Sequence, residues 1–123
     1  MKKISILLLI FLLISCSGNN SNATYKQIST DEAQKIFEKQ GDYLIVDVRT
    51  KEEYDSGHIP NAINIPVETI NNKPSELNDL NQDIYIYCRS GNRSKQAAEK
   101  LVKLGYTNII EFGGIINWNG EIE

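Results

Sequence analysis

The sequence predicts an α/β domain with a mostly parallel central sheet of about five short strands and helices on both faces. Two apolar runs, residues 43–48 (YLIVDV) and 83–88 (DIYIYC), indicate strands that are buried on both faces. Segments with helical periodicity alternate with these strands along the chain. Because parallel strands need crossover connections, the alternation favours a parallel sheet that helices cover on both sides.

The elements of the first half have local signals of their own. Ser29 and Glu32 have the spacing of a capping box, and the helix that they begin is expected to close at Gly41. Residues 51–57 (KEEYDSG) indicate one short helical turn. Residues 62–66 (AINIP) predict a short strand that ends at its proline.

The second half continues the same alternation. Residues 67–80 carry weak helical signals that are broken at a proline. Residues 92–105 (NRSKQAAEKLVKLG) place alanines, leucines and a valine along one helical stripe and end in a glycine, so a helix is predicted. Residues 108–112 (NIIEF) predict the last strand. Tyr85 and Tyr87 alternate with isoleucines in their strand and are given no functional role.

The N-terminal residues do not fit this domain. Two lysines precede a run at residues 4–14 that is apolar except for one serine, which suits an export signal and is shorter than the roughly 20 residues that span a bilayer. The following Leu-Ile-Ser-Cys resembles the lipobox of bacterial lipoproteins, which implies cleavage before Cys16 and lipidation of that cysteine. The alternative is a plain signal peptide in which Cys16 is incidental.

The predicted organisation therefore has three parts: a signal peptide at 1–15, a lipidated cysteine and flexible tether at 16–24, and one domain at 25–123. The expected location is the bacterial cell envelope, on a lipid anchor at the membrane or its periplasmic face. Loss of the signal leaves 11 basic against 16 acidic residues, so no nucleic-acid partner is expected.

A lipidated Cys16 would leave Cys88 without an intramolecular disulfide partner. Cys88 ends an apolar strand, and a helix is predicted to begin at about Asn92 to Ser94. Backbone N–H groups of the intervening turn, which Gly91 helps to curl, form an anion-binding cup at the helix start. Arg89 and Arg93 add positive charge, and such surroundings favour the nucleophilic thiolate. The alternative is a small buried hydrophobe.

The stretches CRSGNRS (88–94) and VDVRTKEEYDSGHIPNAINIP (46–66) resemble the rhodanese (thiosulfate sulfurtransferase) superfamily, specifically its small single-domain exported members. The resemblance covers residues 25–118. A proline is common in this family where the chain has Asn119. The residues that match the family motifs are Asp47, Arg49, Glu53, Tyr54, Gly57, His58, Ile59, Ala62, Cys88, Gly113, Gly114 and Trp118.

The resemblance implies a ping-pong transfer of sulfane sulfur. The Cys88 thiolate would take the outer sulfur of a donor such as thiosulfate, release sulfite, and pass the sulfur from a persulfide to cyanide, a thiol or a protein thiol. The resemblance implies neither a metal nor another cofactor, and a monomer is expected. The loop residues that would bind the donor and the persulfide are Arg89, Ser90, Gly91, Asn92 and Arg93.

Two other functions share these features. Phosphatases and arsenate reductases of this fold or loop type place five residues between the cysteine and the arginine, whereas four residues separate Cys88 from Arg93. The tighter loop suits a single sulfur atom better than a tetrahedral oxyanion. A persulfide carrier or sensor, which accepts sulfur without efficient turnover, would have the same loop.

Several matched residues are expected to support the site rather than to react. His58 is expected to brace the turn before a strand, because a thiolate that is already ionised needs no general base. Asp47 and Arg49 are expected to form an ion pair that fixes neighbouring turns, and Arg49 is also a candidate partner for Glu53. Trp118 is expected to plug the core beneath the last loop.

Overall fold

The computed structural model describes residues 24–123, so the predicted signal peptide and Cys16 lie outside the described residues. Its strands are β1 (Lys26–Gln27), β2 (Tyr43–Asp47), β3 (Ile63–Asn64), β4 (Asp83–Cys88) and β5 (Ile109–Gly114). Its helices are α1 (Thr30–Phe37), α2 (Lys51–Asp55) and α3 (Asn92–Lys103), with 3₁₀ turns η1 (Val67–Thr69) and η2 (Ile115–Asn117).

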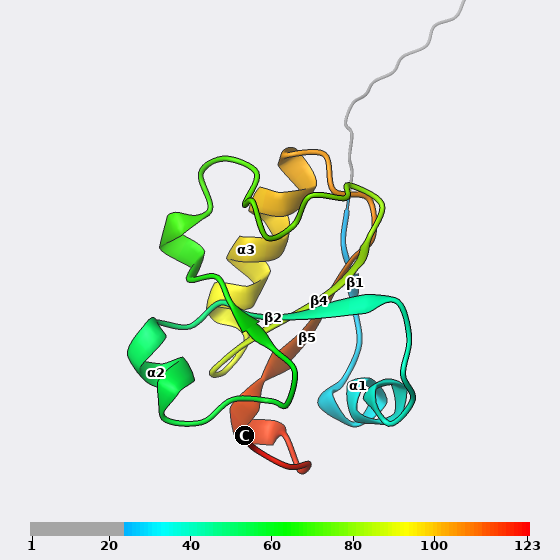
Figure 1. Cartoon of the computed structure of the whole chain (residues 1–123), viewed down its shortest axis with the longest axis vertical. Helices are drawn as coiled ribbons and strands as arrows, with labels where there is room; N and C mark the ends of the chain where they lie inside the picture. Colours follow the sequence, from blue (N-terminus) through cyan, green and yellow to red (C-terminus); the bar gives the residue numbers. More distant parts are fainter. Residues whose placement is uncertain (1–23) are drawn as a thin grey trace, which may run out of the picture.

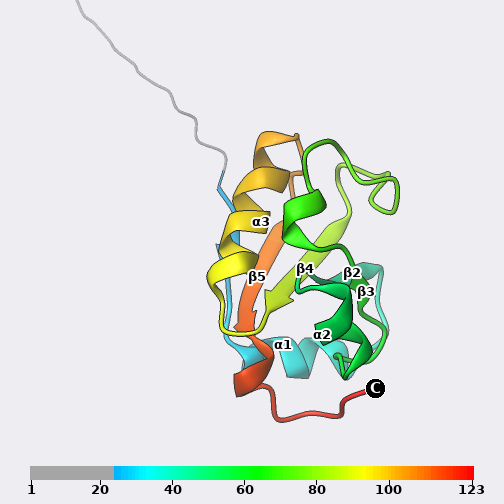
Figure 2. The same cartoon turned by 90° about the vertical axis from the view of Figure 1, so that its left-hand side faces the viewer.

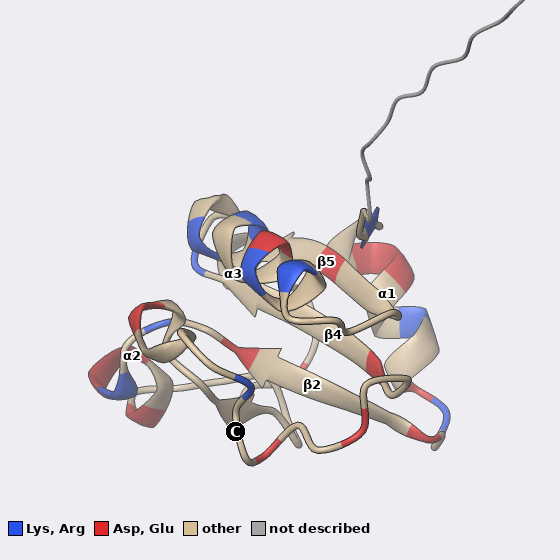
Figure 3. Cartoon of the chain, turned by 90° about the horizontal axis from the view of Figure 1, so that it is seen from above, with Lys and Arg blue, Asp and Glu red and all other residues tan. Residues whose placement is uncertain are grey.

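The sheet has the strand order β1-β5-β4-β2-β3, and every neighbouring pair is parallel. Helices α1 and α3 lie on opposite sides of it (Figures 1 and 3), while α2 follows β2 at the carboxyl end of the sheet (Figure 2). The predicted α/β architecture is therefore confirmed. No helix within residues 24–123 is both long enough and apolar enough to cross a membrane.

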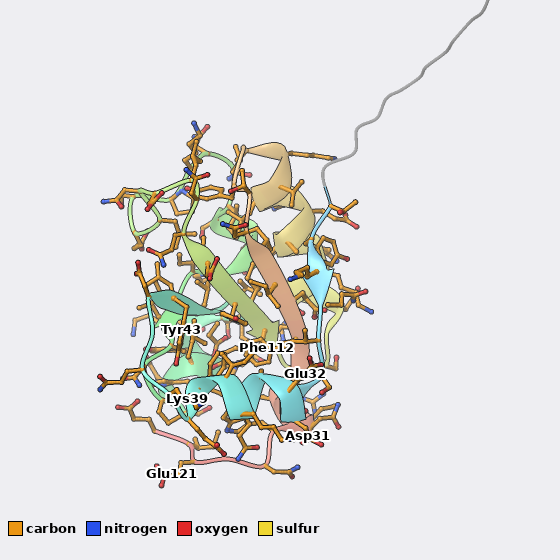
Figure 4. All side chains as sticks on the ribbon, turned by 90° about the vertical axis from the view of Figure 1, so that its right-hand side faces the viewer. Asp31, Glu32, Lys39, Tyr43, Phe112 and Glu121 are labelled. Atoms are coloured by element: carbon orange, nitrogen blue, oxygen red, sulfur yellow. The ribbon has the colours of Figure 1, made fainter. Side chains whose placement is uncertain are left out.

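The side chains of β4 contribute to two hydrophobic cores, one on each face of the sheet. Successive side chains of a strand point to opposite faces, and both faces of β4 are covered. Ile84, Ile86 and Cys88 pack in the cluster under α3, with Ala97 and Leu101 of that helix. The other face packs aromatic and aliphatic side chains against α1, and Figure 4 shows Tyr43 and Phe112 between the sheet and that helix; the buried members are Ala33, Ile45, Ile59, Ala62, Tyr87 and Phe112.

The helix starts depend on side-chain caps. Ser29 Oγ accepts a hydrogen bond from the Glu32 N–H of α1 at 3.0 Å, as its spacing predicts. Thr50 and Glu53 form a complete capping box at the start of α2, which explains why a helix of only five residues is well defined. The local signal for this second box is the sequence Thr-Lys-Glu-Glu at residues 50–53.

Three segments of the structure differ from the sequence-based expectations. Helix α1 ends at Phe37, before the predicted stop at Gly41. Residues 67–80 form only η1, because Pro74 interrupts the helical pattern before a second turn accumulates. Strand β1 was not predicted, since its two residues are exposed and carry no apolar pattern; pairing with β5 makes it a strand.

A β-bulge interrupts the pairing of β4 with β5. Ile86 lies opposite Glu111, whereas Cys88 lies opposite Gly114, so β5 has one extra residue between these pairs. Gly113 occupies this segment with a φ of +93°, which glycine adopts without strain. Gly114 follows at the point where the turn after β4 rests against β5. A Cβ atom on Gly114 would lie 2.0 Å from Arg89 O, so a larger residue does not fit.

Gly114→Ala is expected to lower the free energy of unfolding by about 2–4 kcal/mol, because the added methyl group forces the β4 turn away from β5. Equilibrium urea unfolding, followed through the fluorescence of Trp118, measures this loss. Gly105→Ala is the matched control. Its φ of +106° gives backbone strain alone, about 1–2 kcal/mol, since the nearest atoms to its Cβ are Leu80 methyls at 3.9 Å. A loss at Gly114 no larger than that at Gly105 would contradict the steric argument.

Candidate active site

Cys88 ends the central strand β4, at the edge of the sheet where ligands bind in open parallel sheets. Its residue surface is only 1% exposed. The Gly91 N–H points back at the thiol and lies 3.0 Å from Cys88 Sγ. Gly91 makes this turn possible with a φ of +112°, and α3 begins at the next residue. The thiol therefore sits inside a turn of backbone amides at a helix start.

The five predicted loop residues all lie in this turn or at the beginning of α3. Arg89, Ser90 and Asn92 are exposed, Gly91 is buried, and Arg93 is half-buried in the first turn of the helix. The Arg89 carbonyl accepts a hydrogen bond from Ile116 N at 3.2 Å, which ties the turn to η2. The backbone of the loop is thus fixed by the sheet, while the Arg89 side chain faces solvent.

Arg93 does not face the thiol as a free cation. Its guanidinium makes a bidentate ion pair with Glu53 of α2, with Nη1–Oε1 and Nη2–Oε2 distances of 2.7 and 3.1 Å. The hydrogen bonds from Arg93 lower the pKa of Glu53 to about 2. The same hydrogen bonds, together with the charges of Glu53 and Cys88, raise the pKa of Arg93. This contact corrects the expectation that Glu53 pairs with Arg49.

Arg49 pairs instead with the buried Asp47. Its side chain donates to both Asp47 carboxylate oxygens at 2.7–3.0 Å, and its Nη2 also donates to Gly57 O at 2.7 Å. Burial is the largest single effect on the pKa of Arg49, and it lowers that pKa. The hydrogen bond to Asp47 and the charge of its carboxylate act against burial, and the net result is a raised pKa. Asn64 of β3 donates to the carbonyls of Asp47 and Arg49. The pair therefore holds the ends of β2 and β3 and the turn after α2.

Tyr87 extends this network, although its place in an apolar strand does not indicate a role. Its hydroxyl donates to Asp47 Oδ2 at 2.7 Å and accepts from Ile59 N at 3.0 Å. Burial, and then the hydrogen bond to Asp47, raise the pKa of Tyr87. The Arg49 guanidinium lies 5.8 Å from the centre of the Tyr87 ring. The only sequence signal was a tyrosine one residue before Cys88 in a fully buried strand.

His58 lies away from the thiol. Its Nδ1 contacts Tyr54 O at 2.9 Å, its ring stacks on that of Tyr54, and its backbone pairs with that of Glu123. Trp118 packs near Phe37 and Phe112 on the α1 side of the sheet. Neither side chain has a described contact with Cys88.

Two residues that the sequence reading missed do lie beside the thiol. Ser94 Oγ is 3.4 Å from Cys88 Sγ and 2.5 Å from Glu111 Oε2. Glu111 belongs to β5 and is 2% exposed. A charged residue inside the apolar run of residues 109–112 was the available signal, because such residues are rarely buried without a partner.

The charges around the site have a clear distribution. Acidic residues gather on α2, and basic residues gather on α3 (Figure 3). Within residues 24–123, no group of three or more His, Cys, Asp or Glu side chains could hold a metal ion. A thiol held by an amide, with cations near it, suits nucleophilic attack on sulfur and stabilisation of a departing anion.

Comparison with known proteins places this geometry in a family. A family model described as a rhodanese-like domain matches residues 29–121. The chain is 38% identical to a sulfurtransferase of Allochromatium vinosum over 75% of its own length and 86% of the relative's. It is 37% identical to the thiosulfate sulfurtransferase PspE of Escherichia coli, over 57% of this chain and 68% of that protein.

Other relatives are longer than this chain. The putative sulfur carrier protein YrkF of Bacillus subtilis is 36% identical over 86% of this chain, which spans 57% of that protein. The chain spans between 22% and 26% of three fungal proteins named adenylyltransferase and sulfurtransferase.

Solved structures agree on the fold. A rhodanese-like domain protein from Staphylococcus aureus superposes with a TM-score of 0.68 at 39% identity, over 80% of this chain and 96% of that one. A rhodanese from E. coli, solved with anions, gives a TM-score of 0.61 at 32% identity, over 66% and 96% of the two chains. With its cysteine-bearing turn between β4 and α3, the chain belongs to the rhodanese-like domain family.

Proposed function

We propose that the chain is a sulfurtransferase that moves a sulfane sulfur from a donor such as thiosulfate to a thiophilic acceptor through a Cys88 persulfide. The observation that carries this proposal is the 3.0 Å hydrogen bond from Gly91 N to Cys88 Sγ at the start of α3. A donor aimed at sulfur stabilises a thiolate, which is the species that attacks. The family membership supports the same reaction.

The proposed reaction has two half-steps. The Cys88 thiolate attacks the outer sulfur of the donor, the donor's S–S bond breaks, and its electron pair leaves with sulfite. An acceptor (cyanide, a thiol or a protein thiol) then attacks the outer sulfur of the persulfide and regenerates Cys88. No metal or other cofactor takes part in this scheme.

The loop residues have distinct proposed roles. Backbone amides of residues 89–93 hold the persulfide and the leaving anion, as positioned donors do where negative charge develops. Arg89 is exposed and has no ion pair within residues 24–123, so it is the cation best placed to attract an anionic donor. Arg93 contributes through its position at the helix start, with part of its charge balanced by Glu53.

Asp47, Arg49 and His58 are proposed to support the site rather than to react. The Asp47 carboxylate joins β2 to the Tyr87 side chain of β4, and Arg49 joins it to the turn at Gly57. His58 braces that same turn against Tyr54. These contacts hold the wall beside the cysteine turn in place.

A second candidate is a persulfide carrier or sensor without efficient turnover. The name of the relative YrkF, a putative sulfur carrier protein, favours it. The near-complete burial of Cys88 is also compatible with a thiol that meets only a matched partner. The first experiment below separates the two functions.

We also propose that Cys16 carries the lipid anchor and that residues 17–24 tether a monomeric domain to the cell envelope. The support is the sequence alone: a short apolar segment, a lipobox-like Leu-Ile-Ser-Cys and a polar stretch after it. Two or more acyl chains hold a protein firmly at a membrane, whereas one holds it only marginally.

Cys88→Ser is expected to abolish sulfite release from thiosulfate with cyanide as acceptor, because the weakly nucleophilic hydroxyl forms no persulfide. Ser75→Ala, an exposed substitution in the loop before β4, is the control and keeps full activity. Absence of turnover in the wild type with thiosulfate, polysulfide and thiol persulfides would reject the enzyme. Mass spectrometry of protein from cells then tests the carrier, which retains a gain of about 32 Da on Cys88. Hydrolysis of an aryl phosphate that depends on Cys88 would instead support a phosphatase.

Glu53→Gln is expected to lower stability at neutral pH and to have a smaller effect at pH 3. The pKa of Glu53 in the folded chain, about 2, lies below its ordinary value of 4.5, so its ion pair stabilises the fold above pH 4.5 and loses this effect as the pH falls towards 2. We expect a difference of about 1–2 kcal/mol at pH 7, less than the full shift implies because the pair is partly exposed.

Urea unfolding of wild type and Glu53→Gln at pH 7 and pH 3 measures this effect. Glutamine keeps the capping-box hydrogen bond to Thr50, so the comparison isolates the charge. Asp55→Asn is the control, since its pair with Lys51 is exposed and contributes little. A difference between wild type and Glu53→Gln that is the same at both pH values would contradict the assignment.

Cys16→Ser is expected to release the full-length protein from the membrane fraction of the producing bacterium, because it removes the acceptor of the lipid. Fractionation of cells labelled with a radioactive fatty acid measures both the label and the location. Cys88→Ser in the full chain is the control, and it keeps the label. A labelled Cys16→Ser protein, or an unlabelled wild type, would reject the anchor.

A further inference from the structure

A buried chain of polar groups leads away from the thiol. Cys88 Sγ lies 3.4 Å from Ser94 Oγ, and Ser94 Oγ lies 2.5 Å from Glu111 Oε2. All three residues are buried, with exposed fractions of 1%, 0% and 2%. They come from β4, α3 and β5, so the three elements meet at this point. The reaction scheme above does not use Ser94 or Glu111.

The hydroxyl of Ser94 has one proton to donate. Its contact with Glu111 Oε2 is the shortest available, and the length is typical of an O–H···O⁻ bond to a carboxylate. The other acceptors in reach are Gly91 O at 3.0 Å and Gly113 O at 3.4 Å. When Ser94 donates to Glu111, its oxygen is left to accept from the Cys88 thiol. The chain of donors then runs from sulfur to carboxylate.

Regular alternation along β5 turns Glu111 toward α3, and the bulge that follows completes its hydrogen bonding. The extra residue between Glu111 and Gly114 lets the Gly113 N–H turn back and donate to Glu111 Oε2 at 2.9 Å. Gln27 of β1 donates to the other carboxylate oxygen at 3.1 Å. A buried carboxylate is costly unless its oxygens are paired, and these contacts supply the pairing without a cation. The carboxylate is held ready beside the thiol.

We propose that Glu111 takes the Cys88 proton through the Ser94 hydroxyl as the thiol becomes a nucleophile, and returns it when the persulfide is consumed. Before the first half-step, the thiol proton passes to Ser94 Oγ and the Ser94 proton passes to Glu111 Oε2, and the thiolate so formed attacks the donor. In the second, the S–S bond of the persulfide breaks, its electron pair returns to Cys88 Sγ, and both protons move back. The proposal rests on Cys88 being the nucleophile, and it makes Ser94 and Glu111 positioning residues.

Other charged groups face this chain. A hollow of about 360 Å³ has Glu111, Ser90, Gly91 and Lys95 among the residues on its wall. Arg93 acts on Cys88 from α3. Burial, and then the charges of Glu99 and Glu111, raise the pKa of Tyr25 at the outer edge of the sheet. On the β2 side, Asp47 is already paired with Arg49, as described above.

The pH profile of Cys88 alkylation by iodoacetamide in the purified chain tests the relay without any sulfur donor. Glu111→Gln keeps the size and hydrogen bonds of the side chain but removes its charge. We expect the midpoint of its alkylation to lie about one pH unit or more above that of the wild type, because the thiol proton no longer has an internal acceptor. Ser94→Ala leaves the carboxylate but removes the link. Its midpoint is expected to lie above that of the wild type.

Upward shifts in both variants distinguish a relay from a carboxylate that only repels the thiolate, because removal of such a carboxylate lowers the midpoint. Glu111→Asp keeps a carboxylate and is expected to restore the shape of the wild-type profile. Should Glu111→Gln not fold, Ser94→Ala alone decides, and an unchanged midpoint overturns the relay. Sulfite release is measured on the same proteins. Upward shifts in both variants without turnover keep the relay and reject the sulfurtransferase, whereas turnover with unchanged profiles does the reverse.

Discussion

The carboxylate of Asp47 is the fixed point on which the carboxyl edge of the sheet depends. It is fully buried, and it accepts hydrogen bonds from Arg49 and from the Tyr87 hydroxyl. A buried charge is tolerated only where it is paired and hydrogen-bonded, so removal of either partner would leave a costly orphan. Because Tyr87 immediately precedes Cys88, the same network fixes the backbone that delivers the thiol. The position of the cysteine turn therefore depends on contacts with the neighbouring strand β2.

In this site, the positive charges and the direct contact to the thiol come from different groups. Two of the chain's three arginines, Arg49 and Arg93, are held by carboxylates, and only Arg89 extends into solvent. An arginine that is paired with a carboxylate orients the neighbouring turn more than it neutralises the charge of a ligand. The direct partner of the thiol is instead the Gly91 amide, whose direction is set by covalent geometry and not by a flexible side chain. An acidic protein can in this way create a local anion site without a strongly basic surface.

Local patterns predicted the architecture, and long-range pairing supplied what they could not. The apolar run that ends at Cys88 and the helical stripe after it placed the thiol at a strand–helix turn, because each signal lies within a few residues. Glu53 and Arg93 are 40 positions apart, and Ser94 and Glu111 are 17 apart. Their contacts depend on strand order and on a bulge. Neither feature can be predicted from local sequence patterns alone. Strand β1 was missed for the same reason.

The bulge in β5 interrupts the regular pairing with β4 and supplies a hydrogen-bond donor to Glu111. One residue fewer between Glu111 and Gly114 would restore an even ladder with β4, yet it would remove the extra residue that lets the Gly113 N–H turn back to the carboxylate. A shortened chain could therefore keep its strands and leave the Glu111 carboxylate with one donor fewer. The length of this one segment is consequently a constraint on how the protein can change by insertion or deletion, separate from any constraint on which residues occupy it.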